Sequence, residues 1–135
     1  MTAFLLRGGR VIDPASAIDG DHDVLVRDGE IEAVERAGTR MNLADATVVD
    51  VSGCWIVPGL TDPHVHLRDP GFPQKETIQT GLRAAAAGGF TTVAAMANTS
   101  PVNDNPEITR YMLARAKDTH SARLVPVSTL RGAGQ

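Results

Sequence analysis

Two histidines separated by a single residue are the feature of this sequence with the most specific chemistry. His64 and His66 stand in the stretch DPHVHLR, which begins at Asp62 and ends at Arg68. Because alternate side chains of a β-strand share a face, an extended chain directs Asp62 and Arg68 to the same side as the histidines. Neutral imidazole binds Zn, Ni, Fe and Co. The pattern predicts His64 and His66 as ligands of one metal ion, with Arg68 placed to bind a substrate carboxylate beside it.

The same residues also have ordinary structural explanations. Pairs of surface histidines with this spacing occur without binding a native metal. Asp62 could be a turn or cap carboxylate, and Arg68 could form an exposed ion pair with Asp69, which is worth little. Spacing alone leaves both interpretations open.

A second candidate lies in the stretch MANTSP, where the next predicted strand ends. Asn98 could present its side-chain amide to a carboxylate or an amide of a substrate. An asparagine after a strand more commonly forms an Asx-turn, so this alternative also stays open.

The first half of the sequence reads as short strands joined by tight turns. Apolar or β-branched runs occupy residues 4–6, 11–12, 24–27, 30–34 and 48–51. Asp28-Gly29 accepts positive φ at both positions, which favours a two-residue hairpin of type I′. We expect a small antiparallel β domain over residues 1–53, which would be marginal on its own.

The second half alternates strands with helices. We expect strands over residues 55–60, 90–97 and 123–127, a helix over 74–87, and a second helix that begins at Asn105-Pro106. Ile78 and Leu82 mark the inward stripe of the first helix, and asparagine followed by proline is a typical helix start. This alternation predicts an α/β fold with parallel strands over residues 54–135.

Composition excludes several classes of partner. The chain has 135 residues and a formal net charge of −3, which disfavours binding to nucleic acid or to an anionic membrane. It has no apolar run of about 18 residues that could span a bilayer. One cysteine excludes a disulfide framework and fits a reducing compartment. We therefore expect a cytoplasmic protein with a small-molecule substrate.

Longer motifs resemble a known family. The stretch PGLTDPHVHLRDPG over residues 58–71 resembles the first barrel strand of the amidohydrolase superfamily. Together with Lys75-Glu76-Thr77, Gly81, the AAAAGGF run and MANTSPVND, it resembles dihydroorotases of the longer, type I class. The resemblance implies a composite, urease-like β domain over residues 1–53. It also implies that residues 54–135 are the first three βα units of an incomplete TIM-type (β/α)8 barrel of a metal-dependent hydrolase.

That resemblance implies an activity and a set of residue roles. The reaction is the reversible cyclisation of N-carbamoyl-L-aspartate to L-dihydroorotate in de novo pyrimidine (UMP) biosynthesis, with one or two Zn²⁺ ions per full-length subunit. His64 and His66 would be metal ligands, and Arg68, Asn98 and His66 would bind substrate. The proton-shuttling aspartate and the remaining ligands would follow on later strands. No catalytic residue is therefore expected within this chain, and we expect the 135-residue polypeptide alone to be inactive.

Two alternatives remain beside the dihydroorotase hypothesis. One is another cyclic amidohydrolase, an allantoinase or dihydropyrimidinase, although the combination of Arg68 with Asn98 favours a substrate that carries an α-carboxylate. The other is a non-catalytic dihydroorotase-like partner of aspartate carbamoyltransferase, against which the two intact histidines count. A homodimer or a complex with aspartate carbamoyltransferase is the expected assembly.

Overall fold

The computed structural model describes residues 2–43 and 45–130, and it divides the chain into two compact units, Met1–Pro58 and Gly59–Gln135. The last residues of the predicted second domain, 131–135, lie outside the described residues. No helix in the described part of the chain is long and apolar enough to cross a membrane.

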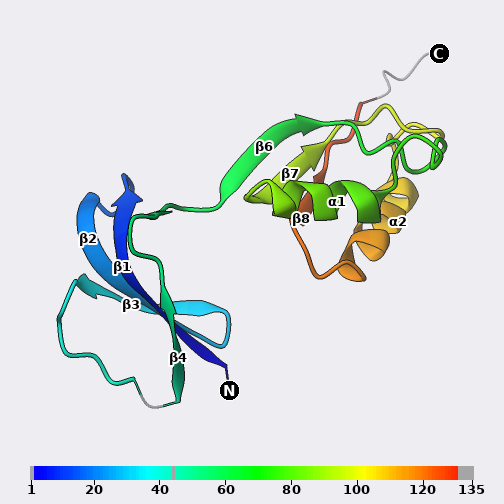
Figure 1. Cartoon of the computed structure of the whole chain (residues 1–135). Coiled ribbons are helices and arrows are strands. Elements are labelled where there is room, and N and C mark those ends of the chain that lie inside the picture. Colours follow the sequence, from blue (N-terminus) through cyan, green and yellow to red (C-terminus); the bar gives the residue numbers. More distant parts are fainter. Residues whose placement is uncertain (1, 44, 131–135) are drawn as a thin grey trace. The chain divides into compact units, whose positions relative to one another are not determined.

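The first unit is a five-stranded sheet of mixed direction (Figure 1). Its strands are β1 (Ala3–Asp13), β2 (Ile18–Arg27), β3 (Glu30–Arg36), β4 (Ala46–Asp50) and β5 (Trp55–Ile56). The order is β3-β2-β1-β4, and β5 also pairs with β1. Both β4 and β5 run parallel to β1, so the prediction of a purely antiparallel domain is wrong. The long connection after β3 returns the chain so that β4 runs beside β1 in the same direction.

Local turn signals behave as the sequence indicates, with one exception. Asp28 and Gly29 have φ values of 50° and 86°, which confirms the predicted hairpin between β2 and β3. The apolar runs over residues 4–6 and 11–12, which Gly8-Gly9 separates in the sequence, belong to one strand in the structure, β1. It continues through a register shift between Leu6 and Gly9, so the glycines form an irregularity within one long strand.

The boundary between the units falls at Pro58–Gly59 rather than after Gly53. A single strand was expected over residues 55–60, but the structure has two separate strands there. Trp55–Ile56 pairs with β1, whereas the next strand, β6 (Leu60–Val65), pairs with β7 (Phe90–Ala95). Pro58 lies between them and has no N–H to donate to a sheet, which helps to explain the interruption.

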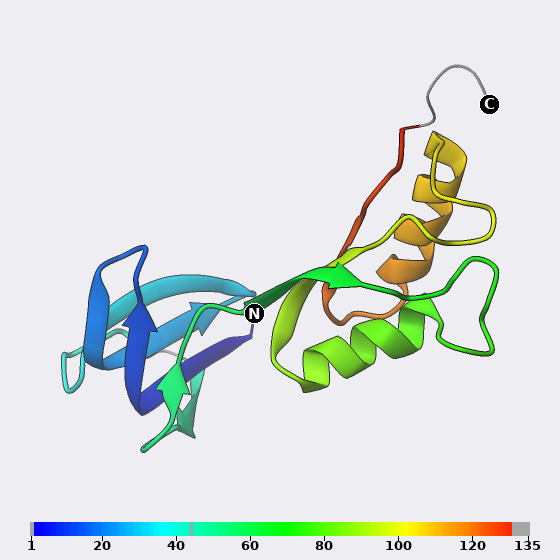
Figure 2. The same cartoon turned by 90° about the horizontal axis from the view of Figure 1, so that it is seen from above.

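The second unit consists of strands and helices in alternation, as predicted. Its elements are β6, α1 (Ile78–Ala87), β7, α2 (Pro106–Lys117) and β8 (Arg123–Pro126). The three strands are parallel in the order β6-β7-β8. Both helices pack on one face of this sheet, and the chain can be followed in the perpendicular view (Figure 2). The core between helices and sheet contains Leu67, Ile78, Leu82, Val93, Ala95, Met112, Ala122 and Leu124.

The two helices begin where their caps place them. Asn105 Oδ1 accepts hydrogen bonds from the backbone N–H groups of Glu107 and Ile108, at 2.9 and 3.1 Å, which confirms the predicted start of α2. The first helix begins at Ile78 instead of near residue 74, because Thr77 is its N-cap. Residues before Thr77 therefore belong to the loop that follows β6.

Candidate active site

The ends of β6 and β7 bring His64, His66 and Asn98 together. The Nε2 atoms of the two histidines are 3.3 Å apart, and their rings meet edge to face with centroids 5.0 Å apart. His66 Nδ1 lies 2.9 Å from Asn98 Oδ1. These neighbouring strands also join through the Met96 N–H, which donates to the Val65 carbonyl at 2.9 Å.

The spacing of the two ring nitrogens suits a shared metal ion. Two nitrogen ligands about 2.0–2.1 Å from a tetrahedral zinc ion are themselves about 3.3–3.4 Å apart. An amide oxygen only accepts hydrogen bonds, so His66 Nδ1 is the donor to Asn98, and in the neutral imidazole the lone pair is on Nε2, the atom that faces His64. Both histidines are exposed on the sheet face that the helices leave open. This donor set is chemically competent to hold a transition metal.

Asp62 does not share the direction of the histidines. The pairing of β6 with β7 shifts between Asp62 and Val65, across Pro63, and this shift breaks the simple alternation of side chains. Asp62 is the lateral partner of the core residue Val93, and its Oδ1 accepts from the His64 backbone N–H at 3.0 Å. The prediction that Asp62 and the histidines face the same way is therefore wrong, and its alternative as a turn carboxylate is confirmed.

Arg68 stands just beyond the strand in a left-handed backbone conformation, with φ 59°. It is half-buried, and its guanidinium makes no ion pair or hydrogen bond within the described part of the chain. The alternative of an Arg68–Asp69 ion pair is therefore excluded in this structure. Asp69 is instead buried and accepts a hydrogen bond from the Tyr111 hydroxyl on α2, at 2.9 Å.

The two loops that carry the candidate residues are fastened to each other. The Ser100 N–H donates to the Pro70 carbonyl at 2.9 Å. Gly71 has φ 113°, and a Cβ placed there would stand 2.6 Å from the Ser100 carbonyl oxygen. Glycine is thus required where the loop after β6 touches the loop after β7. Arg68 and Asn98 belong to one connected loop structure.

A comparison with known protein families shows which family this chain belongs to. Residues 53–131 match the sequence profile of a family described as dihydro-orotase-like. The matched segment covers more than half of the chain, and it contains both loops described above. This chain belongs to the dihydro-orotase-like family.

Curated relatives in this family carry the name dihydroorotase. The chain is 54% identical over 127 residues to the dihydroorotase of Syntrophotalea carbinolica, which covers 94% of this chain and 29% of that protein. It is 51% identical over 127 residues to the dihydroorotase of Geobacter sulfurreducens, with the same shares covered. The chain thus spans about 30% of the length of the curated relatives it matches.

Solved structures agree with the fold of this dihydro-orotase-like chain. An L-hydantoinase (dihydropyrimidinase) from Arthrobacter aurescens matches 95% of this chain and 28% of its own with a TM-score of 0.78 at 22% identity. A D-hydantoinase from a Bacillus species matches 69% of this chain and 20% of its own, with a TM-score of 0.57 at 33% identity. The chain therefore has the fold of amidohydrolases of the hydantoinase type, with an amino-terminal β domain followed by βα units.

Sequence reasoning missed a buried asparagine in this dihydro-orotase-like site. Asn103 is 0% exposed. Its Nδ2 donates to the Val127 carbonyl at 2.9 Å, and its Oδ1 accepts from the Thr109 hydroxyl at 2.8 Å. It therefore ties the loop that carries Asn98 to the end of β8. Its place in MANTSPVND was the available signal, but a polar residue in a loop gives no sign of burial.

No third metal ligand joins the two histidines in the part of the chain that the structure describes. No group of three or more His, Cys, Asp or Glu side chains there could hold a metal ion. Some binuclear metal sites use a carbamylated lysine as a ligand, so Lys75 is also a candidate by residue type. It is exposed, and its Nζ lies 5.5 Å from the centre of the Phe72 ring. The histidine pair is therefore an incomplete ligand set by itself.

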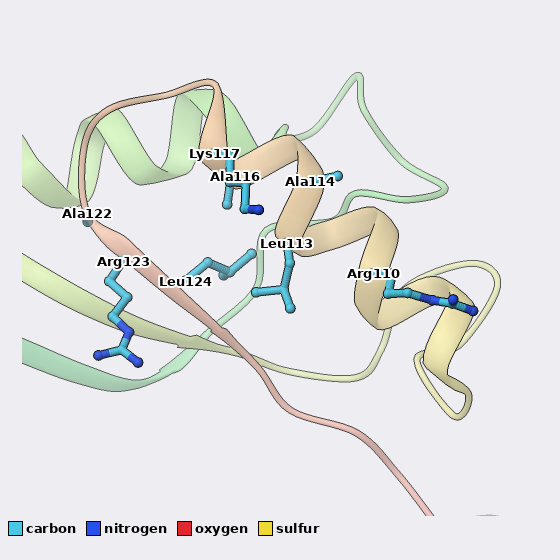
Figure 3. Close-up of a pocket in the computed structure, with 8 residues that line it drawn as sticks. All are labelled: Arg110, Leu113, Ala114, Ala116, Lys117, Ala122, Arg123 and Leu124. Carbon is cyan, nitrogen blue, oxygen red and sulfur yellow. The ribbon is translucent and has the colours of Figure 1, made fainter.

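A hollow between α2 and β8 has a different character (Figure 3). Leu113 and Leu124 face the space between the helix and the strand, and Arg110 and Arg123 stand at its margins. None of the predicted site residues lines it. Its apolar floor suits packing rather than hydrolytic chemistry, so the strand ends remain the candidate site.

Proposed function

We propose that this chain supplies the amino-terminal part of a dihydroorotase, which interconverts N-carbamoyl-L-aspartate and L-dihydroorotate in pyrimidine biosynthesis. One observation carries the proposal. The two imidazoles and Asn98 converge at adjacent strand ends in a chain about half identical to proteins named dihydroorotase. The chain spans about 30% of the length of those proteins, and no group of three metal-binding side chains lies among its described residues, so the proposed activity would need further ligands.

His64 and His66 would hold the metal through their Nε2 atoms. The Asn98 oxygen would keep the proton of His66 on Nδ1, and this would direct the Nε2 lone pair to the metal. A bound zinc ion would supply Lewis acidity, which polarises a carbonyl and makes water nucleophilic near neutral pH. We expect one or two such ions per full-length subunit, with the other ligands on later strands.

Arg68 and Asn98 would bind the substrate carboxylate. The Arg68 guanidinium is unpaired among the described residues, and its fork of N–H donors matches the two oxygens of a carboxylate. Asn98 uses its oxygen for His66, so its Nδ2 group remains to donate to substrate. Two anchors on one carboxylate would contribute binding energy and fix the orientation of the substrate ring. His66 would complete the wall of this subsite.

The architecture supports a wider proposal. Three parallel strands with both helices on one face are consistent with the first βα units of a (β/α)8 barrel, whose active site lies at the carboxyl ends of the strands. The first unit would be the composite β domain of such enzymes. We also propose that the protein is cytoplasmic and that it acts as a homodimer or in a complex with aspartate carbamoyltransferase.

A substrate comparison tests the proposed function. The protein, produced as its gene encodes it and loaded with zinc, is offered L-dihydroorotate, N-carbamoyl-L-aspartate, hydantoin and allantoin. We expect turnover of the first two, loss of turnover on chelation and recovery with zinc. If the protein turned over hydantoin or allantoin but not dihydroorotate, it would instead be another cyclic amidohydrolase. Stable association with aspartate carbamoyltransferase without turnover would assign a non-catalytic partner.

A further inference from the structure

A buried carboxylate lies next to the residue that would bind substrate. Asp69 follows Arg68 directly and is only 4% exposed. Its Oδ1 accepts from the Tyr111 hydroxyl at 2.9 Å, and its Oδ2 accepts a longer hydrogen bond, at 3.4 Å, from the Ile78 backbone N–H. Tyr111 lies on α2, and Ile78 is the first residue of α1. One carboxylate thus connects the loop after β6 to both helices.

The backbone beside this carboxylate has a conformation that needs support. Arg68 has φ 59°, a left-handed value that costs a non-glycine residue free energy and persists only where the surroundings enforce it. On its amino-terminal side the loop is fixed by β6. On its carboxyl-terminal side the nearest side-chain anchor is Asp69, with the Phe72 N–H closing the turn onto the Arg68 carbonyl at 2.8 Å.

Tyr111 is well suited to the role of a specific anchor. Tyr111 is 41% exposed, so its side chain is not part of the buried core, and its hydroxyl donates a directional hydrogen bond to Asp69. Partial burial, followed by the hydrogen bond to Asp69, raises the pKa of the Tyr111 phenol above its ordinary value, whereas the Arg115 charge opposes the rise. The phenol therefore remains a protonated donor to Asp69 throughout the neutral range.

We propose that Asp69 is a positioning residue, which, held by Tyr111 of α2, fixes the backbone turn that aims Arg68 at the substrate carboxylate. The inference rests on the proposed dihydroorotase function, and it assigns a role to two residues outside the histidine and asparagine cluster. Asp69 itself does not touch substrate. Its effect reaches the reaction through Arg68.

Steady-state kinetics of the zinc-loaded protein, as its gene encodes it, test the proposal. Asp69→Ala removes both anchors, and we expect it to raise KM for L-dihydroorotate roughly ten- to hundred-fold, with a smaller change in kcat. Tyr111→Phe deletes only the hydroxyl that donates to Asp69 and is expected to raise KM several-fold. Asp69→Asn keeps an oxygen that can accept from Tyr111, so it should rescue most of the loss. Zinc content should be unchanged in all three variants.

A double-mutant cycle separates positioning from general support of the fold. If Asp69 acts through Arg68, then Asp69→Ala adds no further increase in KM to a protein that already carries Arg68→Met. Asn105→Ala is the matched control, because it weakens the cap of the same helix α2 without touching Asp69. That control should lower thermal stability and leave KM unchanged.

The outcomes distinguish this inference from the function on which it rests. Unchanged KM in Asp69→Ala and Tyr111→Phe, with normal turnover by the unmutated protein, would overturn the positioning role and leave the dihydroorotase function intact. Additive effects of Asp69→Ala and Arg68→Met would also overturn it, since the two residues would then act separately. Absence of turnover in the unmutated, zinc-loaded protein would overturn the proposed function, and the inference with it.

Discussion

Asn98 occupies a pivotal position, because it reaches a candidate metal ligand from the neighbouring strand end. Its oxygen is 2.9 Å from His66 Nδ1, and its amide nitrogen is left for substrate. The sequence indicated Asn98 only as a contact to substrate, and it gave no sign of the contact to His66. The structure therefore supports a second proposed role for the same side chain, that of orienting the His66 imidazole.

The contact between Asn98 and His66 leads to a prediction about zinc affinity. In the zinc-loaded protein, Asn98→Ala should weaken zinc binding about 10- to 100-fold, as is usual when a ligating histidine loses its hydrogen-bond partner. Asn98→Asp retains an acceptor for His66 Nδ1 and should bind zinc at least as tightly as the unmutated protein. Competition with a chromophoric chelator measures both, and equal affinity in all three proteins would show that the contact is incidental.

Arg68 yields a second prediction at the residue scale. Arg68→Met removes charge-assisted hydrogen bonds worth about 1.5–3 kcal/mol and should raise KM for dihydroorotate roughly ten- to hundred-fold. Arg68→Lys keeps the charge but loses the two-pronged geometry, so only part of the affinity should survive. His120→Ala, at an exposed histidine after α2, is the control and should change neither constant. A normal KM in Arg68→Met would remove Arg68 from the substrate site.

At the scale of elements, the contact between loops depends on Gly71. Gly71→Ala should lower the free energy of unfolding by about 2–4 kcal/mol, since its φ of 113° is combined with a Cβ position 2.6 Å from Ser100 backbone. Gly89→Ala is the matched control: its φ is also positive, at 83°, but the nearest atom to its Cβ position, on Leu60, is 4.0 Å away. That variant should lose only about 1–2 kcal/mol, the cost of a Cβ in a left-handed conformation.

Thermal and urea unfolding, followed by circular dichroism, measure both glycine variants. The difference between them isolates the loop contact from the cost of the backbone conformation. Equal losses would mean that the contact between Gly71 and Ser100 contributes nothing to stability. A stable Gly71→Ala variant with a raised KM would show that the loop adapts at the expense of the substrate site.

The cap of α2 gives a separate prediction for this element. Asn105→Ala removes the acceptor for two N–H groups of the first helical turn and should cost about 1 kcal/mol. Asn105→Asp preserves an acceptor and should cost far less. Urea denaturation of the three proteins provides the comparison. A midpoint that does not move in Asn105→Ala would contradict the cap assignment.

Elements were predictable from the sequence where local residues determine them. The hairpin at Asp28-Gly29 and the helix start at Asn105 follow from φ preference and cap chemistry, which act over a few residues. The shifted register around Pro63, which turns Asp62 away from the histidines, depends on pairing with β7. The partner of a strand depends on residues distant in the sequence, so the register of β6 could not be predicted from its own residues.

In the candidate site, too, some features follow from local residues and others depend on distant contacts. His64, His66, Arg68 and Asn98 could be selected by residue type and spacing, and by resemblance of the surrounding motifs. The anchors that hold them could not, because Asp69 and Asn103 are ordinary polar loop residues until the fold buries them. Burial of a polar side chain is decided by helices and strands that arrive from elsewhere in the chain.

At the scale of the whole molecule, the second unit has apolar surface that its own residues leave exposed. In the described sheet β6 and β8 are edge strands, and Val125 and Leu113 are 42% and 39% exposed. Edge strands and apolar patches favour association between copies. Residues 1–135 expressed alone should therefore form oligomers as concentration rises, and light scattering should detect them.

Two substitutions sharpen that prediction. Leu113→Lys combined with Val125→Lys should reduce association, because it places charge on the hollow and on the edge strand. Ile31→Lys adds one charge at an exposed position of the first unit and should reduce association much less. A monodisperse monomer of the unmutated chain at high concentration would contradict the prediction.

We propose above that the ends of β6 and β7 form the metal- and carboxylate-binding part of a dihydroorotase. The most direct test is a crystal structure of the zinc-loaded protein, as its gene encodes it, with N-carbamoyl-L-aspartate and anomalous data at the zinc edge. We predict an anomalous peak about 2.0–2.1 Å from Nε2 of both His64 and His66, with the substrate carboxylate on Arg68 and Asn98. A zinc peak away from the histidine pair, or a carboxylate bound elsewhere, would contradict the account.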